Sequence, residues 1–154
     1  LDFDIFEVII VGAGAKRKEV ESKLASFPEV SLYPPVPYEE LADLLCSADV
    51  HLLFQKPEVL DTVMPSKILG MMASAKPSII TGHPHSEVAD VMSDSGGGYY
   101  SSEKDVALVL QQLEQLASQK ERATQMGAKA RDYVVTHFSK DEILARFIKA
   151  LAEI

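Results

Sequence analysis

The residues of this sequence best suited to chemistry are Pro65, Ser66 and Lys67, which open a predicted helix. Proline suits the first turn of a helix, because the N–H group that it lacks would have no partner there. The next N–H groups point out of the helix end, and the helix dipole attracts an anion to them. Lys67 adds a positive charge, although it could instead be a solvated side chain of a first turn. This segment predicts a phosphate or diphosphate site, and hence a nucleotide or nucleotide-sugar ligand.

The composition is that of an acidic globular protein. Of the 154 residues, 47% are apolar and 25% are charged, and the formal net charge is −8. Nucleic-acid binding needs a basic face, so we expect no nucleic-acid partner. No apolar run approaches the roughly 20 residues of a membrane-spanning helix. The single cysteine, Cys46, follows Leu44 and Leu45, which predicts a buried thiol and a cytoplasmic protein.

Strand and helix patterns alternate along the chain. Apolar runs predict strands at residues 7–11, 30–33, 50–54, 77–81 and 99–100. Helical patterns cover residues 16–26, stretches opening at Pro37 and Pro65, residues 87–92, 106–116 and 120–136, and a last helix begun by the capping pair Ser139 and Glu142. Such repeats are typical of an α/β fold, a Rossmann-like parallel sheet with helices on both faces, here with a helical C-terminus. We expect a single domain over residues 1–154, with Met64, Met71, Met72 and the mid-strand His51 as core or sheet-face residues.

Ligands of such a sheet bind beyond the carboxyl ends of its strands. The loops at residues 12–14, 33–38, 55–66 and 82–86 occupy that edge. Gly12 and Gly14 allow a tight turn and let a ligand approach the backbone. Arg17 stands where a dinucleotide fingerprint needs glycine or alanine, which argues against an NAD site. His83 and His85 lie in the last loop as donor-sugar contacts or as solvated side chains, and we expect no metal because no third ligand is evident.

Four motifs follow one another in a fixed order. They are Gly12-Ala13-Gly14, Val36-Pro37-Tyr38-Glu39-Glu40-Leu41, Ala48-Asp49-Val50, and Ala73-Ser74-Ala75-Lys76-Pro77 after the Pro65 helix. This ordered set, which covers almost the whole chain, resembles the C-terminal, donor-binding half of GT-B glycosyltransferases of family four (group 1). It is most similar to the branch that builds bacterial surface polysaccharides. Ala75 replaces the glycine that is usual in the family's Ala-x-Gly-Lys-Pro turn.

The resemblance implies a function as well as a fold. The chain would bind the donor of a retaining, metal-independent glycosyltransferase of polysaccharide or glycoconjugate biosynthesis. It would use no cofactor, because the UDP- or GDP-linked sugar is a substrate. The first strand–helix unit, the catalytic residues and the N-terminal acceptor-binding domain, its partner, would lie upstream. We therefore expect the chain to be an inactive fragment on its own, with any contact to the inner face of the membrane made by the missing half.

The resemblance also assigns donor contacts by position. After Pro65, the N–H groups of Ser66 and Lys67 would hold the diphosphate, with the Lys67 ammonium offsetting the charge of the leaving group. The base would lie against the 33–38 loop, and the 55–64 loop would face the sugar. Thr62 and Gly70 stand where the family has two glutamates, and Asp61 is the candidate substitute. The implied donor-binding residues are Gly12, Gly14, Val36, Tyr38, Asp61, Thr62, Pro65, Ser66 and Lys67.

Two other classes of protein stay open. A non-enzymatic interaction module or a receiver-like module would share the α/β pattern, but a receiver needs acidic residues where Gly12 and Phe54 stand. A sugar-nucleotide epimerase has a sheet of the same class. If one edge of the sheet is uncovered in this chain, self-association is expected.

Overall fold

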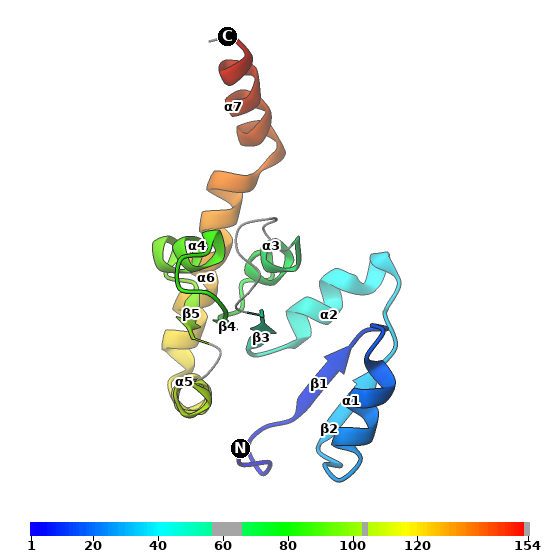
Figure 1. The fold of residues 1–154 in the computed structure, drawn as a ribbon. Helices are drawn as coiled ribbons and strands as arrows, with labels where there is room; N and C mark the ends of the chain where they lie inside the picture. Colours follow the sequence, from blue (N-terminus) through cyan, green and yellow to red (C-terminus); the bar gives the residue numbers. More distant parts are fainter. Residues whose placement is uncertain (57–65, 103–104, 153–154) are drawn as a thin grey trace. The chain divides into compact units, whose positions relative to one another are not determined.

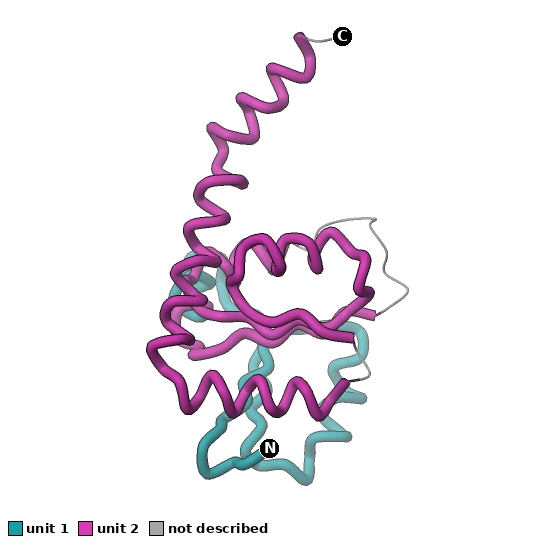
Figure 2. Tube along the Cα trace, turned by 90° about the vertical axis from the view of Figure 1, so that its left-hand side faces the viewer, with its two compact units in different colours: residues 1–44 teal, residues 45–154 magenta. Residues whose placement is uncertain are grey.

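The computed structural model describes residues 1–56, 66–102 and 105–152 (Figure 1). The chain divides into two compact units, Leu1–Leu44 and Leu45–Ile154, coloured separately in Figure 2. We call them the first and second unit and treat each by itself. The single domain expected over residues 1–154 stays a prediction.

The first unit contains one pair of parallel strands. β1 (Val8–Val11) pairs with β2 (Val30–Tyr33), and α1 (Arg17–Leu24) lies between them in the chain. The register places Val11 opposite Tyr33, and the N–H group of Gly12 donates to the Tyr33 carbonyl at 3.1 Å. The two strands therefore end at the same level, and the loops that follow them leave from one edge.

The chain after β2 passes through Pro34 to Pro37 into a short 3₁₀ helix, η1 (Tyr38–Glu40), and then into α2 (Leu41–Ser47). The sequence places a helix start at Pro37, and Pro37 is the N-cap of η1. Proline fits this place because it has no N–H group to leave unpaired.

The second unit is built on a three-stranded parallel sheet in the order β3-β4-β5. Its strands are β3 (His51–Phe54), β4 (Ser78–Thr81) and β5 (Gly98–Ser101). The helices α3 (Ser66–Ala73) and α4 (Glu87–Ser95) lie on one face, and α5 (Val106–Ser118) lies on the other (Figure 1). All four residues of β4 are buried, as expected for a central strand covered on both faces. The predicted α/β architecture, with parallel strands and helices on both faces, is confirmed.

The core of this unit lies between β4, α3, α4 and the long helix α6 (Lys120–Phe138). Its fully or almost fully buried members are Ile68, Met72, Ile80, Val88, Val91, Met92 and Ala130. On the opposite face of the sheet, α5 buries Val109, Leu113 and Leu116. Met71 and Met72 are buried at 5% and 1% exposure, as predicted, whereas Met64 lies outside the described residues.

The turn between α3 and β4 has a backbone that usually requires glycine. Ala75 has a φ of 58°, in the left-handed region where a Cβ atom crowds the neighbouring carbonyl. The turn is covered by α6, from which Arg131 donates through Nη1 to the Ala73 carbonyl at 2.7 Å. The motif that resembles Ala-x-Gly-Lys-Pro therefore keeps the glycine conformation with an alanine.

The last helix, α7 (Lys140–Ala152), begins as predicted after Ser139. The Ser139 hydroxyl accepts from the N–H group of Glu142 at 3.4 Å, and Arg146 donates to the His137 carbonyl at the end of α6. Among its described residues α7 buries none, and Phe147, Ile148 and Leu151 are exposed. Within the described part of the chain, no helix is both long and apolar enough to cross a membrane.

The predicted burial of Cys46 is wrong. Cys46 is exposed, and its thiol lies 4.0 Å from the Ser74 carbonyl oxygen. Its neighbours Leu44 and Leu45 are half-buried. Successive residues of a helix point about 100° apart, so apolar neighbours do not place the next side chain in the core.

Candidate functional site

The first group of predicted site residues lies at the carboxyl edge of the β1–β2 pair. Gly12 and Gly14 follow β1, and a Cβ atom on either would meet no atom of the described residues within 4 Å. The space beside this loop is thus open, as the approach of a ligand to the backbone requires. Val36 is half-buried, and Tyr38, with 85% of its surface exposed, presents its ring to solvent.

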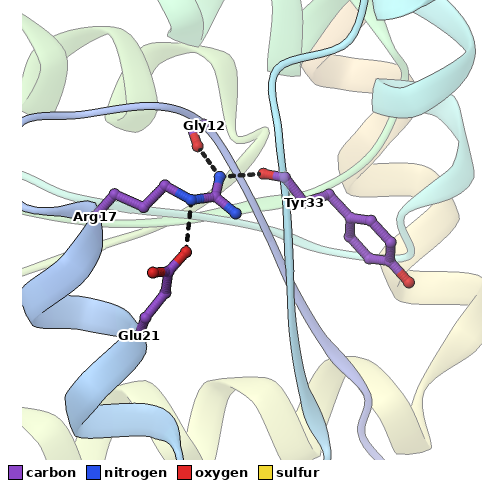
Figure 3. Close-up of polar contacts among 4 residues, drawn as sticks. All are labelled: Gly12, Arg17, Glu21 and Tyr33. Atoms are coloured by element: carbon purple, nitrogen blue, oxygen red, sulfur yellow. Dashed lines mark hydrogen bonds and ion pairs between the residues drawn. The ribbon is translucent and has the colours of Figure 1, made fainter.

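Arg17 joins the ends of these two strands (Figure 3). Its Nη1 atom donates to the Gly12 carbonyl at 2.5 Å and to the Tyr33 carbonyl at 2.9 Å, while Nε donates to Glu21 at 2.7 Å. The sequence marks Arg17 only as the residue that breaks the dinucleotide fingerprint. The one sequence signal for its role is Glu21 four positions later, the spacing of an ion pair on a helix.

The second group lies in the second unit, at the start of α3. The helix begins at Ser66, and Ser66 and Lys67 are both exposed. The first turn of α3 contains no acidic residue that would repel an anion. Asp61, Thr62 and Pro65 lie outside the described residues.

The family's second glutamate position also lies on α3. Gly70 is half-buried, and a Cβ atom there would lie 3.2 Å from a methyl group of Leu45. A glutamate at this place would have to displace Leu45. The absence of a carboxylate at residue 70 therefore agrees with the packing around it.

The loop at residues 82–86 leaves from the carboxyl end of β4, next to the end of β3. Tyr100 of β5 fixes it, because its hydroxyl donates to the His83 carbonyl at 2.8 Å and lies 2.8 Å from the Ser86 hydroxyl. Ser86 in turn caps α4 by accepting from the N–H group of Ala89 at 3.2 Å. No motif of the sequence marked Tyr100 for this role.

His83 and His85 lie on this loop with ring centroids 5.7 Å apart. The N–H group of His85 donates to Nδ1 of His83 at 3.2 Å, so that nitrogen already has a partner. Over the described ranges, no group of three or more histidine, cysteine or acidic side chains is placed to hold a metal ion.

His51 is a core residue, as predicted, and lies at the opposite end of the strand from these loops. Its Nε2 atom is 3.0 Å from the Ser74 hydroxyl, which donates to the Met71 carbonyl at 2.6 Å. Burial lowers the pKa of His51, with a hydrogen bond to the Leu45 backbone acting in the other direction and Lys76 lowering it further. His51 thus lies in a buried, hydrogen-bonded position of the sheet, apart from the loops of the candidate site.

The structure thus brings the predicted residues together in two sets. Gly12, Gly14 and the residues after Tyr33 share one edge of the first unit. In the second unit, Gln55 and the 82–86 loop follow the hydrogen-bonded neighbouring strands β3 and β4. Both sets leave the carboxyl ends of parallel strands, where α/β proteins bind ligands.

Comparison with known proteins identifies the family. Residues 2–131 match the family described as Glycosyl transferases group 1. The chain is 27% identical over 146 residues to a protein of Escherichia coli (strain K12) named "Putative colanic acid biosynthesis glycosyl transferase WcaI". That alignment covers 94% of this chain and 35% of WcaI, so the chain spans about a third of its curated relative.

Solved structures share the fold. Anabaena HepE in complex with UDP superposes with a TM-score of 0.75 at 11% identity, covering 96% of this chain and 41% of HepE. HepE in complex with UDP-glucose gives a TM-score of 0.76 at 12% identity, with the same coverage. At this identity the likeness establishes the fold alone. From the match over residues 2–131, the chain belongs to the group 1 family of glycosyl transferases, as its ordered motifs predicted.

Proposed function

We propose that this chain binds the nucleoside-diphosphate-sugar donor of a retaining, metal-independent glycosyltransferase that acts in polysaccharide or glycoconjugate biosynthesis. The observation that carries the proposal is the exposed first turn of α3, with Lys67 and no acidic residue, in a chain of this family. The name of WcaI and the UDP and UDP-glucose complexes of HepE support the polysaccharide and donor assignments. Family membership favours this function over a receiver-like module or an epimerase.

The chemistry of transfer explains why α3 would matter. When the bond between the anomeric carbon and the diphosphate oxygen breaks, negative charge develops on the departing diphosphate. The N–H groups of Ser66 and Lys67 and the Lys67 ammonium would stabilise that charge in the role that a metal ion has in other enzymes. In the first unit, Gly12, Gly14, Val36 and Tyr38 would contact the nucleoside side of the donor.

Three further residues keep their proposed roles although they lie outside the described residues. Pro65 would belong to the diphosphate end of the helix, Thr62 stands at the position of the first family glutamate, and Asp61 would substitute for that glutamate. We propose that the acceptor-binding site and the catalytic residues belong to a separate domain. This chain alone would then bind the donor without transferring the sugar.

Calorimetric titration of this 154-residue chain with UDP, GDP and ADP tests the proposal. We expect one of UDP and GDP to bind more tightly than ADP, and the affinity to be unchanged by EDTA. No heat with any of the three at millimolar concentration would overturn donor binding. A requirement for a divalent cation would overturn only the metal-independent part.

A further inference from the structure

The carboxyl edge of the first unit contains a side chain that the donor-binding proposal does not use. Arg17 is the first residue of α1, directly after the glycine loop, and 29% of its side chain is exposed. Its backbone N–H group donates to the Gly14 carbonyl at 2.9 Å, and its Nη1 atom donates to the Gly12 carbonyl. Arg17 therefore holds both ends of the glycine loop.

The same guanidinium also reaches the neighbouring strand. The Tyr33 carbonyl accepts from Nη1 of Arg17 at 2.9 Å (Figure 3). It also accepts from the N–H group of Gly12 at 3.1 Å. Tyr33 is the last residue of β2, and the chain that leaves it leads to Val36 and Tyr38. A single planar group thus fixes the starting points of both loops that the first unit contributes to the proposed function.

The charge of Arg17 is already engaged inside the protein. Nη1 donates hydrogen bonds to two carbonyl oxygens, and Nε forms an ion pair with Glu21 at 2.7 Å. Charge-assisted hydrogen bonds of this kind are stronger and more directional than neutral ones, and the rigid fork of arginine fixes the geometry of all of its acceptors. Lysine has a point charge without this fork, so it cannot hold the two carbonyls and the carboxylate together.

We propose that Arg17 is a positioning residue for the nucleotide, which locks the 12–14 loop and the start of the 33–38 loop into one arrangement that is ready to bind. The inference rests on the proposed donor binding and deepens it. Pre-organised loops bind more tightly because no free energy is lost in ordering them, and affinity falls with the fraction of molecules in the competent arrangement.

The test uses UDP as the probe and compares Arg17→Met and Arg17→Lys with a matched control. The control, Lys23→Met, removes the exposed Lys23–Glu19 ion pair from the same helix without touching either loop. We expect both Arg17 variants to bind UDP about tenfold more weakly, as when a tenth of the molecules are competent, and Lys23→Met to bind like the wild type. In ¹⁵N-correlated spectra without ligand, the amide signals of Gly12, Gly14 and Val36 should broaden in the Arg17 variants alone.

The outcomes separate this inference from the function on which it rests. If the wild-type chain binds no nucleotide, donor binding and the role of Arg17 fall together. If the wild type binds UDP and Arg17→Met binds it equally well, only the role of Arg17 is overturned. If Arg17→Lys bound UDP as tightly as the wild type, the positive charge alone would suffice, and this result would also overturn the positioning role.

A second variant separates the ion pair with Glu21 from the two carbonyl contacts of Arg17. Glu21→Gln keeps an oxygen acceptor for Nε and leaves both carbonyl contacts in place. We expect its loop signals to stay sharp and its UDP affinity to remain close to that of the wild type. If Glu21→Gln lost as much UDP affinity as Arg17→Lys, the effect of Arg17 could not be assigned to its two carbonyl contacts.

Discussion

Gly127 of α6 lies against the main chain of Ala75, so closely that a Cβ atom on Gly127 would stand 2.0 Å from the Ala75 carbonyl oxygen. Main-chain atoms of a turn cannot rotate away as the end of a side chain can. The long helix thus approaches the turn between α3 and β4 through the one residue type that leaves room.

Replacing this glycine should destabilise the second unit. We expect Gly127→Ala to lower the free energy of unfolding by about 2 kcal/mol, because overpacking outweighs the better helix propensity of alanine. Urea denaturation measures the change. Gly70→Ala is the matched control, because among the described residues its Cβ atom would meet only a methyl group of Leu45, at 3.2 Å. Equal stability of the two variants would contradict this packing of α6.

The opposite exchange at residue 75 should stabilise the protein. Ala75 has a φ of 58°, and glycine adopts this conformation without a Cβ clash. We expect Ala75→Gly to raise the free energy of unfolding by about 0.5–1 kcal/mol, after the greater freedom of glycine in the unfolded chain is subtracted. Ala73→Gly, at the last residue of α3, relieves no left-handed backbone and should lower it instead. A destabilised Ala75→Gly protein would show that the alanine side chain makes contacts worth more than this strain.

Stability should depend on pH through His51. Burial lowers the pKa of His51 below its ordinary value of 6.5, so the unfolded chain binds this proton at a higher pH than the folded protein. Above pH 6.5, the titration of His51 therefore does not change the free energy of unfolding. As the pH falls from 6.5 toward the folded-state pKa, this free energy decreases by at most about 1.4 kcal/mol per pH unit.

Urea denaturation at pH 7.5, 6.5 and 5.5 measures this dependence. His51→Gln should flatten the curve, since glutamine can keep a hydrogen bond with the Ser74 hydroxyl but does not titrate. His85→Gln, at an exposed loop position, is the control and should keep the slope of the wild type. An unchanged slope in His51→Gln would assign the pH dependence to other groups.

The Tyr100 hydroxyl should stabilise the 82–86 loop. In Tyr100→Phe, the His83 carbonyl and the Ser86 hydroxyl each lose a partner at 2.8 Å. We expect the free energy of unfolding to fall by about 1–2 kcal/mol, the cost of leaving such groups unpaired. Thermal melts should also show a larger drop in melting temperature than for Ser118→Ala, whose hydroxyl bonds to carbonyls of its own exposed helix turn. Equal drops in melting temperature for the two variants would show that the Tyr100 hydroxyl does not stabilise the loop.

Lys67 should contribute directly to nucleotide affinity. Lys67→Ala removes a positive charge from the first turn of α3, and we expect UDP or GDP binding to weaken by about 1–3 kcal/mol in calorimetry. Lys140→Ala removes an exposed lysine from the first turn of α7 and should leave the affinity unchanged. If the two variants bind alike, Lys67 has no part in the site.

The elements of this fold could be predicted because each has a local cause. Short apolar runs predicted β3 and β4. Ser139 predicted the start of α7, and Pro37 predicted the start of η1. Element ends were less exact. α4 runs to Ser95, three residues beyond the predicted end, because Gly96 closes it in the left-handed conformation.

The contacts that fix the loops could not be predicted, since they join residues far apart in the chain. Arg17 reaches the Tyr33 carbonyl 16 positions away, and Tyr100 reaches His83 across 17. Neither residue type indicates its partner. The exposure of Cys46 was also missed, because helix rotation rather than neighbouring leucines decides which way a side chain points.

The full burial of β4 has a consequence for measurement. Ser78, Ile79 and Ile80 are 0% exposed, and the strand is hydrogen-bonded on both sides. Their amide protons can reach solvent deuterium only when the second unit opens as a whole. Native-state deuterium uptake at Ile79 and Ile80 will therefore report global opening of this unit, free from the fraying of its loops and helix ends.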